Sequence, residues 1–132
     1  MVKHIYNFGR PMTNTKQVFL NFKENLLKLG ESKEYVILIG LNNDYRPVFD
    51  HVEIVGEVER INYRPELFFK KLSDNGCKRC VLIFSHKSNT LKATKKDRIL
   101  IANVRLLADL YEVMILDNII IKADLTSYNS IL

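Results

Sequence analysis

The stretch that decides the fold is residues 81–86, VLIFSH, an apolar run that ends in a histidine. A short run of this kind, bounded by polar residues, predicts a strand that is buried on both faces. After a basic loop, Thr94-x-x-Asp97 predicts the start of a helix, because threonine is a good helix cap and aspartate favours the first turn. We therefore expect His86, at a strand end, to face Asp97, at a helix start.

The rest of the chain alternates between helical and extended patterns. Helices are expected over residues 15–29, from Pro65 to about residue 74 with Leu67 on its apolar face, and over residues 94–110. Strands are expected over residues 35–41, 48–58, 80–85, 113–116, 119–121 and 127–132, with a break at residues 117–118. This order predicts an α/β domain with one mixed sheet covered by helices.

Composition sets wide limits on function. The chain has 132 residues, which suits one domain, and it is 47% hydrophobic and 27% charged. It contains no apolar run as long as a membrane helix and shows no secretion signal, so we expect a cytoplasmic protein with no membrane contact. The net charge of +5 permits an anionic partner, and it equally permits a solvated basic surface.

The two cysteines form a single C-x-x-C motif. A structural zinc site needs four ligands, usually from two such pairs, and a second pair is absent from the sequence. The motif leads into a strand, whereas a redox motif sits between a strand and a helix. We expect Cys77 in a loop and Cys80 in a strand core, both as reduced thiols.

Several landmarks in this order resemble the JAMM (MPN/JAB) domain of RadC-type bacterial proteins. The landmarks are Glu34-Tyr35 before a strand, Gly56, the helix opening at residues 63–66, the strand at residues 81–86, and the segments 116–121 and 127–130. The resemblance covers residues 13–132 and leaves residues 1–12 as an N-terminal extension. It implies a three-layer α/β/α sandwich like that of cytidine deaminases, and it brings a DNA-repair label.

The resemblance also implies a site. In such domains two histidines and an aspartate bind zinc, a glutamate acts as acid and base, and a serine stabilises the oxyanion. By position, Glu34 corresponds to the glutamate and Thr94 to the serine. His86 and Asp97 correspond to two of the zinc ligands. Phe84 occupies the position of the remaining histidine.

The departures from the family pattern accumulate at that site. Catalytic zinc takes three protein ligands plus water, and phenylalanine offers no lone pair. The usual His-Pro-Ser-Gly loop is here HKSN at residues 86–89, and Asn118 replaces a further histidine. We therefore expect no bound metal and a pseudoenzyme that acts as a scaffold or binding module. The alternative is a zinc metallohydrolase that cleaves peptide or isopeptide bonds with an altered ligand set.

Structural roles alone also explain the same residues. Thr94 and Asp97 match a capping box, Glu34 suits a strand entrance, and His86 suits a loop contact to solvent or Asp97. His4 and His51 are the remaining candidates for a substitute ligand. A metal shared between two chains would require a specific homodimer.

Basic residues surround the expected loop and helix start. They are Lys87, Lys92, Lys95, Lys96 and Arg98. Cations beside a helix N-terminus can hold phosphates, so these residues are candidates for contact with DNA. A solvated charged face is the alternative, and a protein partner is also compatible with the sequence.

Overall fold

The computed structural model describes residues 11–26, 34–55, 65–86, 90–122, 124 and 126–131, with the backbone alone for residues 22–26 and 52–55. The elements in chain order are α1 (Thr15–Leu26), β1 (Glu34–Leu41), β2 (Pro47–Val55), α2 (Pro65–Asp74), β3 (Arg79–His86), α3 (Lys95–Leu110), β4 (Met114–Lys122) and β5 (Tyr128–Ser130). The expected end of the first helix, near residue 29, lies outside the described residues. In the described part of the chain, no helix has the length and apolar character needed to span a membrane.

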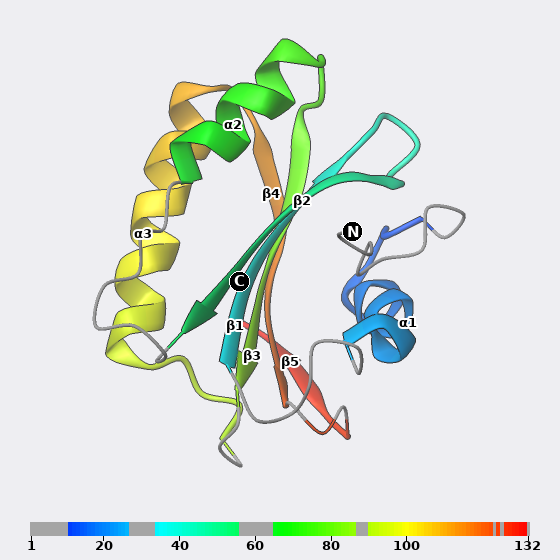
Figure 1. The fold of residues 1–132 in the computed structure, drawn as a ribbon, viewed down its shortest axis with the longest axis vertical. Helices are drawn as coiled ribbons and strands as arrows, with labels where there is room; N and C mark the ends of the chain where they lie inside the picture. The colour runs from blue at the N-terminus through cyan, green and yellow to red at the C-terminus, as the bar shows by residue number, and fades with distance from the viewer. Residues whose placement is uncertain are drawn as a thin grey trace.

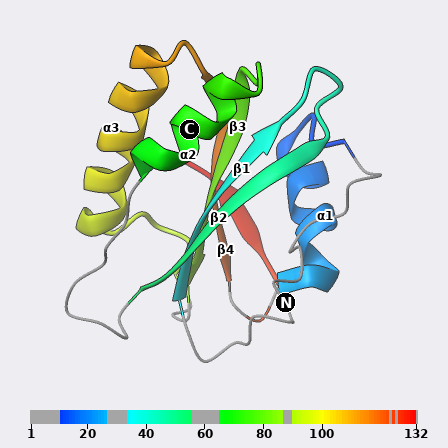
Figure 2. The same cartoon turned by 45° about the horizontal axis from the view of Figure 1, so that its top comes forward.

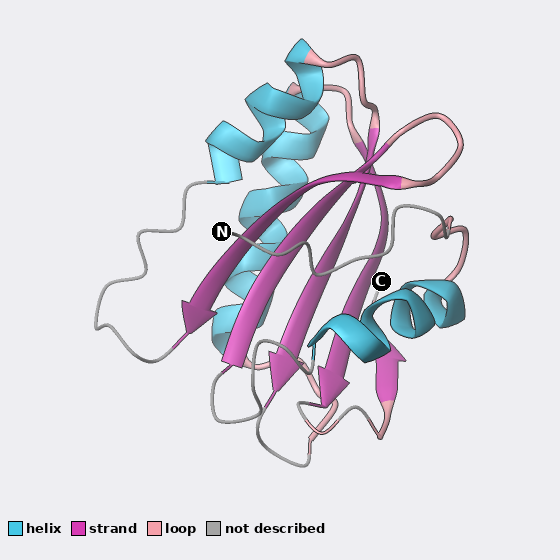
Figure 3. Ribbon diagram, turned by 45° about the vertical axis from the view of Figure 1, so that its right-hand side comes forward, coloured by secondary structure: helices cyan, strands magenta, loops and turns pink. Residues whose placement is uncertain are grey.

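Strand β3, which contains the run VLIFSH, lies at the centre of the sheet. The strand order is β2-β1-β3-β4-β5 (Figure 3), and every neighbouring pair is antiparallel except β3 with β4. The parallel pair is joined by the crossover helix α3, as parallel strands require. In both β1 and β3 every residue after the first is buried, as predicted from their apolar sequences.

Helices cover both faces of the sheet. Helix α1 lies on one face, and α2 and α3 lie on the other (Figure 1), an arrangement that is also visible in the turned view (Figure 2). Because side chains alternate along a strand, Ile37 and Ile83 enter the core beneath α1, whereas Leu38 and Phe84 enter the core beneath α2 and α3. The expected three-layer α/β/α sandwich is therefore confirmed.

Helix α2 packs on the sheet through Leu72, whose side chain lies beside Gly40 of β1. A Cβ atom at Gly40 of β1 would lie 2.2 Å from Cδ2 of Leu72, so any larger residue there would force the Leu72 side chain to move. The helix ends before Gly76, whose φ of 68° is readily adopted only by glycine. The assignment of Leu67 to the apolar face is wrong, because Leu67 is 61% exposed and Phe69 is fully buried in its place.

Strand β4 is continuous, so the expected break at residues 117–118 is wrong. Cys80 pairs with Ile115 and Val81 pairs with Asp117, which leaves Leu116 as an extra residue in a bulge. Asp117 and Asn118 remain in the strand although both are buried. Residues from other elements explain why Asp117 stays in the strand, because it accepts hydrogen bonds from the hydroxyls of Thr15 and Ser130.

The N-terminal boundary proposed from the sequence falls at a residue of the core. Met12 is 1% exposed, and its backbone N–H donates to the carbonyl oxygen of Tyr45 at 2.7 Å. Residues 1–10 lie outside the described part of the chain. The division into an extension over residues 1–12 and a domain over residues 13–132 stays a prediction.

Candidate functional site

The end of β3 and the start of α3 meet, as the sequence predicts. Nε2 of His86, the last residue of β3, lies 2.8 Å from Oδ2 of Asp97, in the first turn of α3. Their side chains are only 5% and 13% exposed. The structure thus brings together two of the residues that the resemblance assigns to metal binding, in direct contact with each other.

Thr94 and Asp97 form the predicted capping box. The Asp97 N–H donates to Oγ1 of Thr94 at 3.1 Å, and the Thr94 N–H donates to Oδ2 of Asp97 at 2.9 Å. These bonds satisfy backbone donors that otherwise lack partners at a helix start. The Asp97 carboxylate oxygen that contacts His86 therefore also fixes the first turn of α3.

Both ring nitrogens of His86 face oxygen acceptors. Nε2 faces Asp97, and Nδ1 lies 3.4 Å from the carbonyl oxygen of Thr90, a longer contact. An imidazole donates from both nitrogens only when it is protonated. The hydrogen bond to Asp97 raises the pKa of His86 above its ordinary value, against the opposing effect of burial. A metal ligand needs the neutral ring, so an ion bound here would have to displace both the ring proton and the contact with Asp97.

The Asp97 carboxylate responds in the opposite direction. Burial alone would raise its pKa, but hydrogen bonds from His86 and from the Thr94 backbone more than offset burial, so the pKa of Asp97 is lowered. The two shifts share one cause, because the charged forms of His86 and Asp97 stabilise each other. The pair is thus an ion pair at the acidic side of neutrality.

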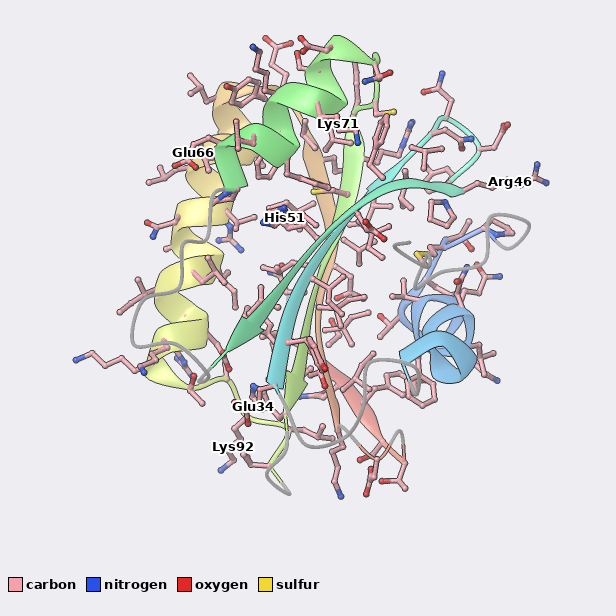
Figure 4. The ribbon with its side chains drawn as sticks, viewed as in Figure 1. Glu34, Arg46, His51, Glu66, Lys71 and Lys92 are labelled. Carbon is pink, nitrogen blue, oxygen red and sulfur yellow. The ribbon has the colours of Figure 1, made fainter. Side chains whose placement is uncertain are left out.

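Glu34 lies at the same end of the sheet as this pair. Tyr35 of β1 pairs with Ser85 of β3, so one further step along the two antiparallel strands places Glu34 opposite His86. Figure 4 shows Glu34 at this end, with Lys92 close by in the same view. After the hydrogen bond to Asp97, the negative charge of Glu34 further raises the pKa of His86.

Phe84 occupies the position that the resemblance gives to the third metal ligand. It is 1% exposed and belongs to the core beneath α2 and α3. Its ring centroid lies 6.5 Å from that of His86, on the same face of β3. The place where a third nitrogen donor would be needed is therefore filled by an aromatic ring.

The donors present do not fit a catalytic zinc ion. His86 and Asp97 supply two ligands, one fewer than such a site takes from the protein. Among the described residues, no three side chains of the His, Cys, Asp or Glu type are grouped closely enough to hold a metal. We therefore derive no catalytic step that passes through a metal ion.

The substitute ligands considered from the sequence do not join this site. His51 pairs with Leu38, four positions along β1 from Glu34, or about 13 Å at strand spacing. In Figure 4 it lies well away from Glu34, toward α2. His4 lies outside the described residues. Cys77 and Cys80 are free buried thiols, as predicted, and burial raises the pKa of Cys80 to about 12.

The structure divides the predicted basic residues into two groups. Lys92 and Arg98 line a groove between α3 and the segment around β5, whereas Lys95 and Lys96 are exposed and are not among its lining residues. Lys87 lies outside the described part of the chain. Contact with DNA through these residues stays a prediction.

Sequence reasoning missed the other residues of this groove. Arg105 and Asp109 of α3 line it opposite Asn129 and Ile131. The spacing of Arg98 and Arg105, seven residues or about two helical turns apart, is a signal that could have placed them on one face. The contribution of Asn129 and Ile131 depends on the pairing of β5 with β4, which local patterns do not reveal.

Comparison with known proteins gives one finding that spans nearly the whole chain. A family model described as RadC-like JAB domain matches residues 12–131. No curated protein matches the chain.

Proposed function

The chain belongs to the RadC-like JAB domain family, and we propose that it is a non-catalytic member that serves as a scaffold or binding module. The family match confirms the resemblance noted in the sequence and agrees with the mixed sheet between helices. Zinc binding is common in this family. The proposal therefore concerns how this member departs from that pattern.

The observation that carries the proposal is the buried ring of Phe84. A zinc ion at this position would need a nitrogen donor there, and the aromatic ring supplies only apolar volume. The neighbouring His86 supports the same conclusion, because both of its ring nitrogens face oxygen acceptors. The remaining ligand candidate, Asp97, contributes to the cap of α3. Each of these residues thus has a structural role that does not require a metal.

The alternative is a zinc-dependent peptidase or isopeptidase with an altered ligand set. Its support is the position of Glu34 beside His86, where a carboxylate could act as a general base toward a bound water. Thr94 and Asp97 would complete the set. This alternative needs a third ligand from outside the described residues or from a second chain.

Metal content distinguishes the two proposals. We expect wild-type protein, purified without a nickel column, to carry far less than one zinc per chain by mass spectrometry. Phe84→His should raise zinc affinity by about tenfold or more, because it adds a donor on the same face of β3 as His86. Phe84→Leu is the matched control, since it removes the ring without adding a ligand.

Two results would count against this interpretation. Stoichiometric zinc in the wild-type protein, lost in His86→Ala, would favour the metallohydrolase. A folded Phe84→His variant with no gain in affinity would show that this position does not correspond to a metal ligand.

A further inference from the structure

A groove of about 870 Å³ runs along α3 beside the β5 edge of the sheet. Helices α2 and α3 cover the part of this face above the other strands, and no helix in the described part of the chain covers β5 on this side (Figure 1). The groove starts at residues 91–93, just before α3, and continues past Arg105 and Asp109. It is separate from the pair formed by His86 and Asp97, which are not among its lining residues.

Positive charge dominates the rim of this groove. Lys92, Arg98 and Arg105 line it, against the single carboxylate of Asp109. Within the described residues, none of these three cations forms an ion pair. Cations that face a groove without protein partners favour an anionic ligand, and arginine is well suited to hold carboxylates.

The lining between these charges is apolar. It consists of Leu91, Ala93, Ile101, Ala102, Leu106 and Ile131. Among the described residues, none of those that line the groove is aromatic and could stack on a nucleic-acid base. Small and branched apolar side chains would fit this surface, so the ligand should combine acidic and apolar groups.

The neighbouring strand edge can bind an extended chain. The N–H of Ile131 donates to the carbonyl of Asn118, and the N–H of Lys122 donates to the carbonyl of Ser127, so odd-numbered residues of this segment face β4. The backbone groups of Tyr128 and Ser130 consequently point to the open edge of the sheet. A strand added there would place alternate side chains on the α3 side, as Asn129 and Ile131 are placed.

A buried polar atom next to the groove also lacks a partner. Asn118 is 1% exposed, and its Oδ1 has no hydrogen-bond partner among the described residues. It lines an adjoining hollow of about 250 Å³ that shares Arg105 and Asp109 with the groove. Because buried polar atoms are normally satisfied, this oxygen marks the interior beside the groove as unusual, although it is itself too enclosed to meet a bound molecule.

We propose that this groove binds an extended segment of a partner protein as an additional strand beside β5, with both acidic and apolar residues among the alternate side chains that face α3. The carboxylates of the segment contact Arg98 and Arg105, and its backbone pairs with Tyr128 and Ser130. The proposal goes beyond the question of metal binding, because no residue of the His86 site takes part.

Two other occupants fit the observations less well. A second copy of this chain would bring another groove with excess positive charge, and like charges oppose such contact. Nucleic acid would satisfy the cations but would leave the apolar lining and the strand edge without suitable partners. Both are outcomes that the following experiment can detect.

The test uses a fluorescein-labelled peptide of about eight residues, the length of an ordinary strand, in which every second residue is in turn glutamate or valine and the residues between are threonine, so that glutamate and valine share one face. We expect fluorescence polarisation to show saturable binding to the full chain and none for a lysine–valine peptide. Arg98→Glu with Arg105→Glu should weaken binding by about tenfold or more, because two charge-assisted contacts are lost. Lys95→Glu with Lys96→Glu makes the same change in net charge outside the groove and should have little effect.

The strand edge has its own matched pair of variants. Ser130→Pro removes an N–H that points to the open edge and should weaken binding, whereas Ser130→Ala keeps that N–H and should not. Both variants lose the hydroxyl that donates to Asp117, so a difference between them does not come from that hydrogen bond. Circular dichroism should show that every variant is folded.

Several results would overturn the proposal. These are absence of binding by the glutamate–valine peptide, equal loss in the two charge-reversed pairs, or equal behaviour of the two Ser130 variants. A labelled single-stranded DNA that binds through Arg98 and Arg105 while the peptide does not would assign the groove to nucleic acid. Self-association that is lost in the Arg98 and Arg105 variant would assign it to a second copy.

Discussion

Asp97 and Asp117 are two largely buried carboxylates on opposite faces of the same sheet, and they differ in where their partners come from. Asp97 contacts Thr94, three residues away, and His86, eleven residues away. Asp117 contacts Ser130 and also Thr15, at a separation of 102 residues. The cluster around Asp97 therefore shapes a local turn, whereas the cluster around Asp117 ties α1 and β5 to β4.

The clusters around Asp97 and Asp117 also differ in their relation to function. The chain places a buried carboxylate with two hydroxyl partners on the α1 side, and that cluster has only a structural role in our interpretation. The cluster on the α3 side occupies the position of a metal site in the family. Its hydrogen bonds nevertheless join groups of this chain to one another, as those of Asp117 do. Three predictions test how far the two clusters differ.

The largest effect is expected for Asp117→Ala. This change leaves the hydroxyls of Thr15 and Ser130 without their acceptor in a region where Asp117 itself is only 6% exposed. We expect a loss of about 2–4 kcal/mol in the free energy of unfolding, measured with urea. Asp117→Asn keeps one acceptor oxygen and should lose less. If Asp117→Ala lowered the free energy of unfolding no more than a surface substitution does, the two clusters would not differ in their effect on stability.

A smaller loss is expected for Asp97→Ala. The change removes the partner of His86 and one half of the capping box, and together these should cost about 1–3 kcal/mol. Thr94→Ala is the control for capping alone, since it leaves the contact between His86 and Asp97 possible. If Asp97→Ala destabilised the protein more than Asp117→Ala does, the local character of this cluster would be disproved.

The smallest effect is a dependence of stability on pH. The pKa of His86 is raised from 6.5 by its hydrogen bond to Asp97, so its stabilising contribution is complete below 6.5 and is lost as pH rises through the folded-state pKa. The pKa of Asp97, which burial alone would raise, is lowered from 3.8, so its contribution is present above 3.8 and is lost at more acidic pH. The pair should therefore stabilise the fold most between pH 3.8 and 6.5.

Urea unfolding at about pH 5 and about pH 8 measures this effect. The difference in stability between wild type and His86→Gln should be larger at the lower pH. The Asp117→Ala variant should keep the same dependence, because its cluster contains no histidine. If wild type and His86→Gln differed in stability by the same amount at both pH values, His86 and Asp97 would not act as an ion pair.

The features that the sequence predicts well are those encoded by neighbouring residues. Strands β1 and β3 follow from apolar runs, and α3 follows from its spacing and the box formed by Thr94 and Asp97. The two adjacent strands β1 and β2, joined by residues 42–46, pair as an antiparallel hairpin. The contact between His86 and Asp97 follows because a strand end and the next helix start adjoin in an α/β fold. Local sequence patterns are enough to predict a contact when the two interacting residues lie close together in the sequence.

The features that the sequence misses depend on distant partners. Asp117 and Asn118 have the character of a turn, but hydroxyls from α1 and β5 keep the aspartate inside the sheet, so β4 continues. Leu67 matches the helical stripe and is nevertheless exposed, because Phe69 takes the place against the sheet. Arg105 could not be singled out from the sequence, because it lines a groove that forms only where α3 and the segment around β5 come together.

The bulge at Leu116 has a consequence for changes in chain length. Ile115 and Asp117 pair with consecutive residues of β3, so β4 contains one residue more than the pairing requires. Loss of that residue during evolution would leave every later side chain on its present face, whereas loss of a residue from 119–121 would invert the faces of those that follow. Relatives of this chain that are one residue shorter in β4 are therefore expected to align with a gap at this position.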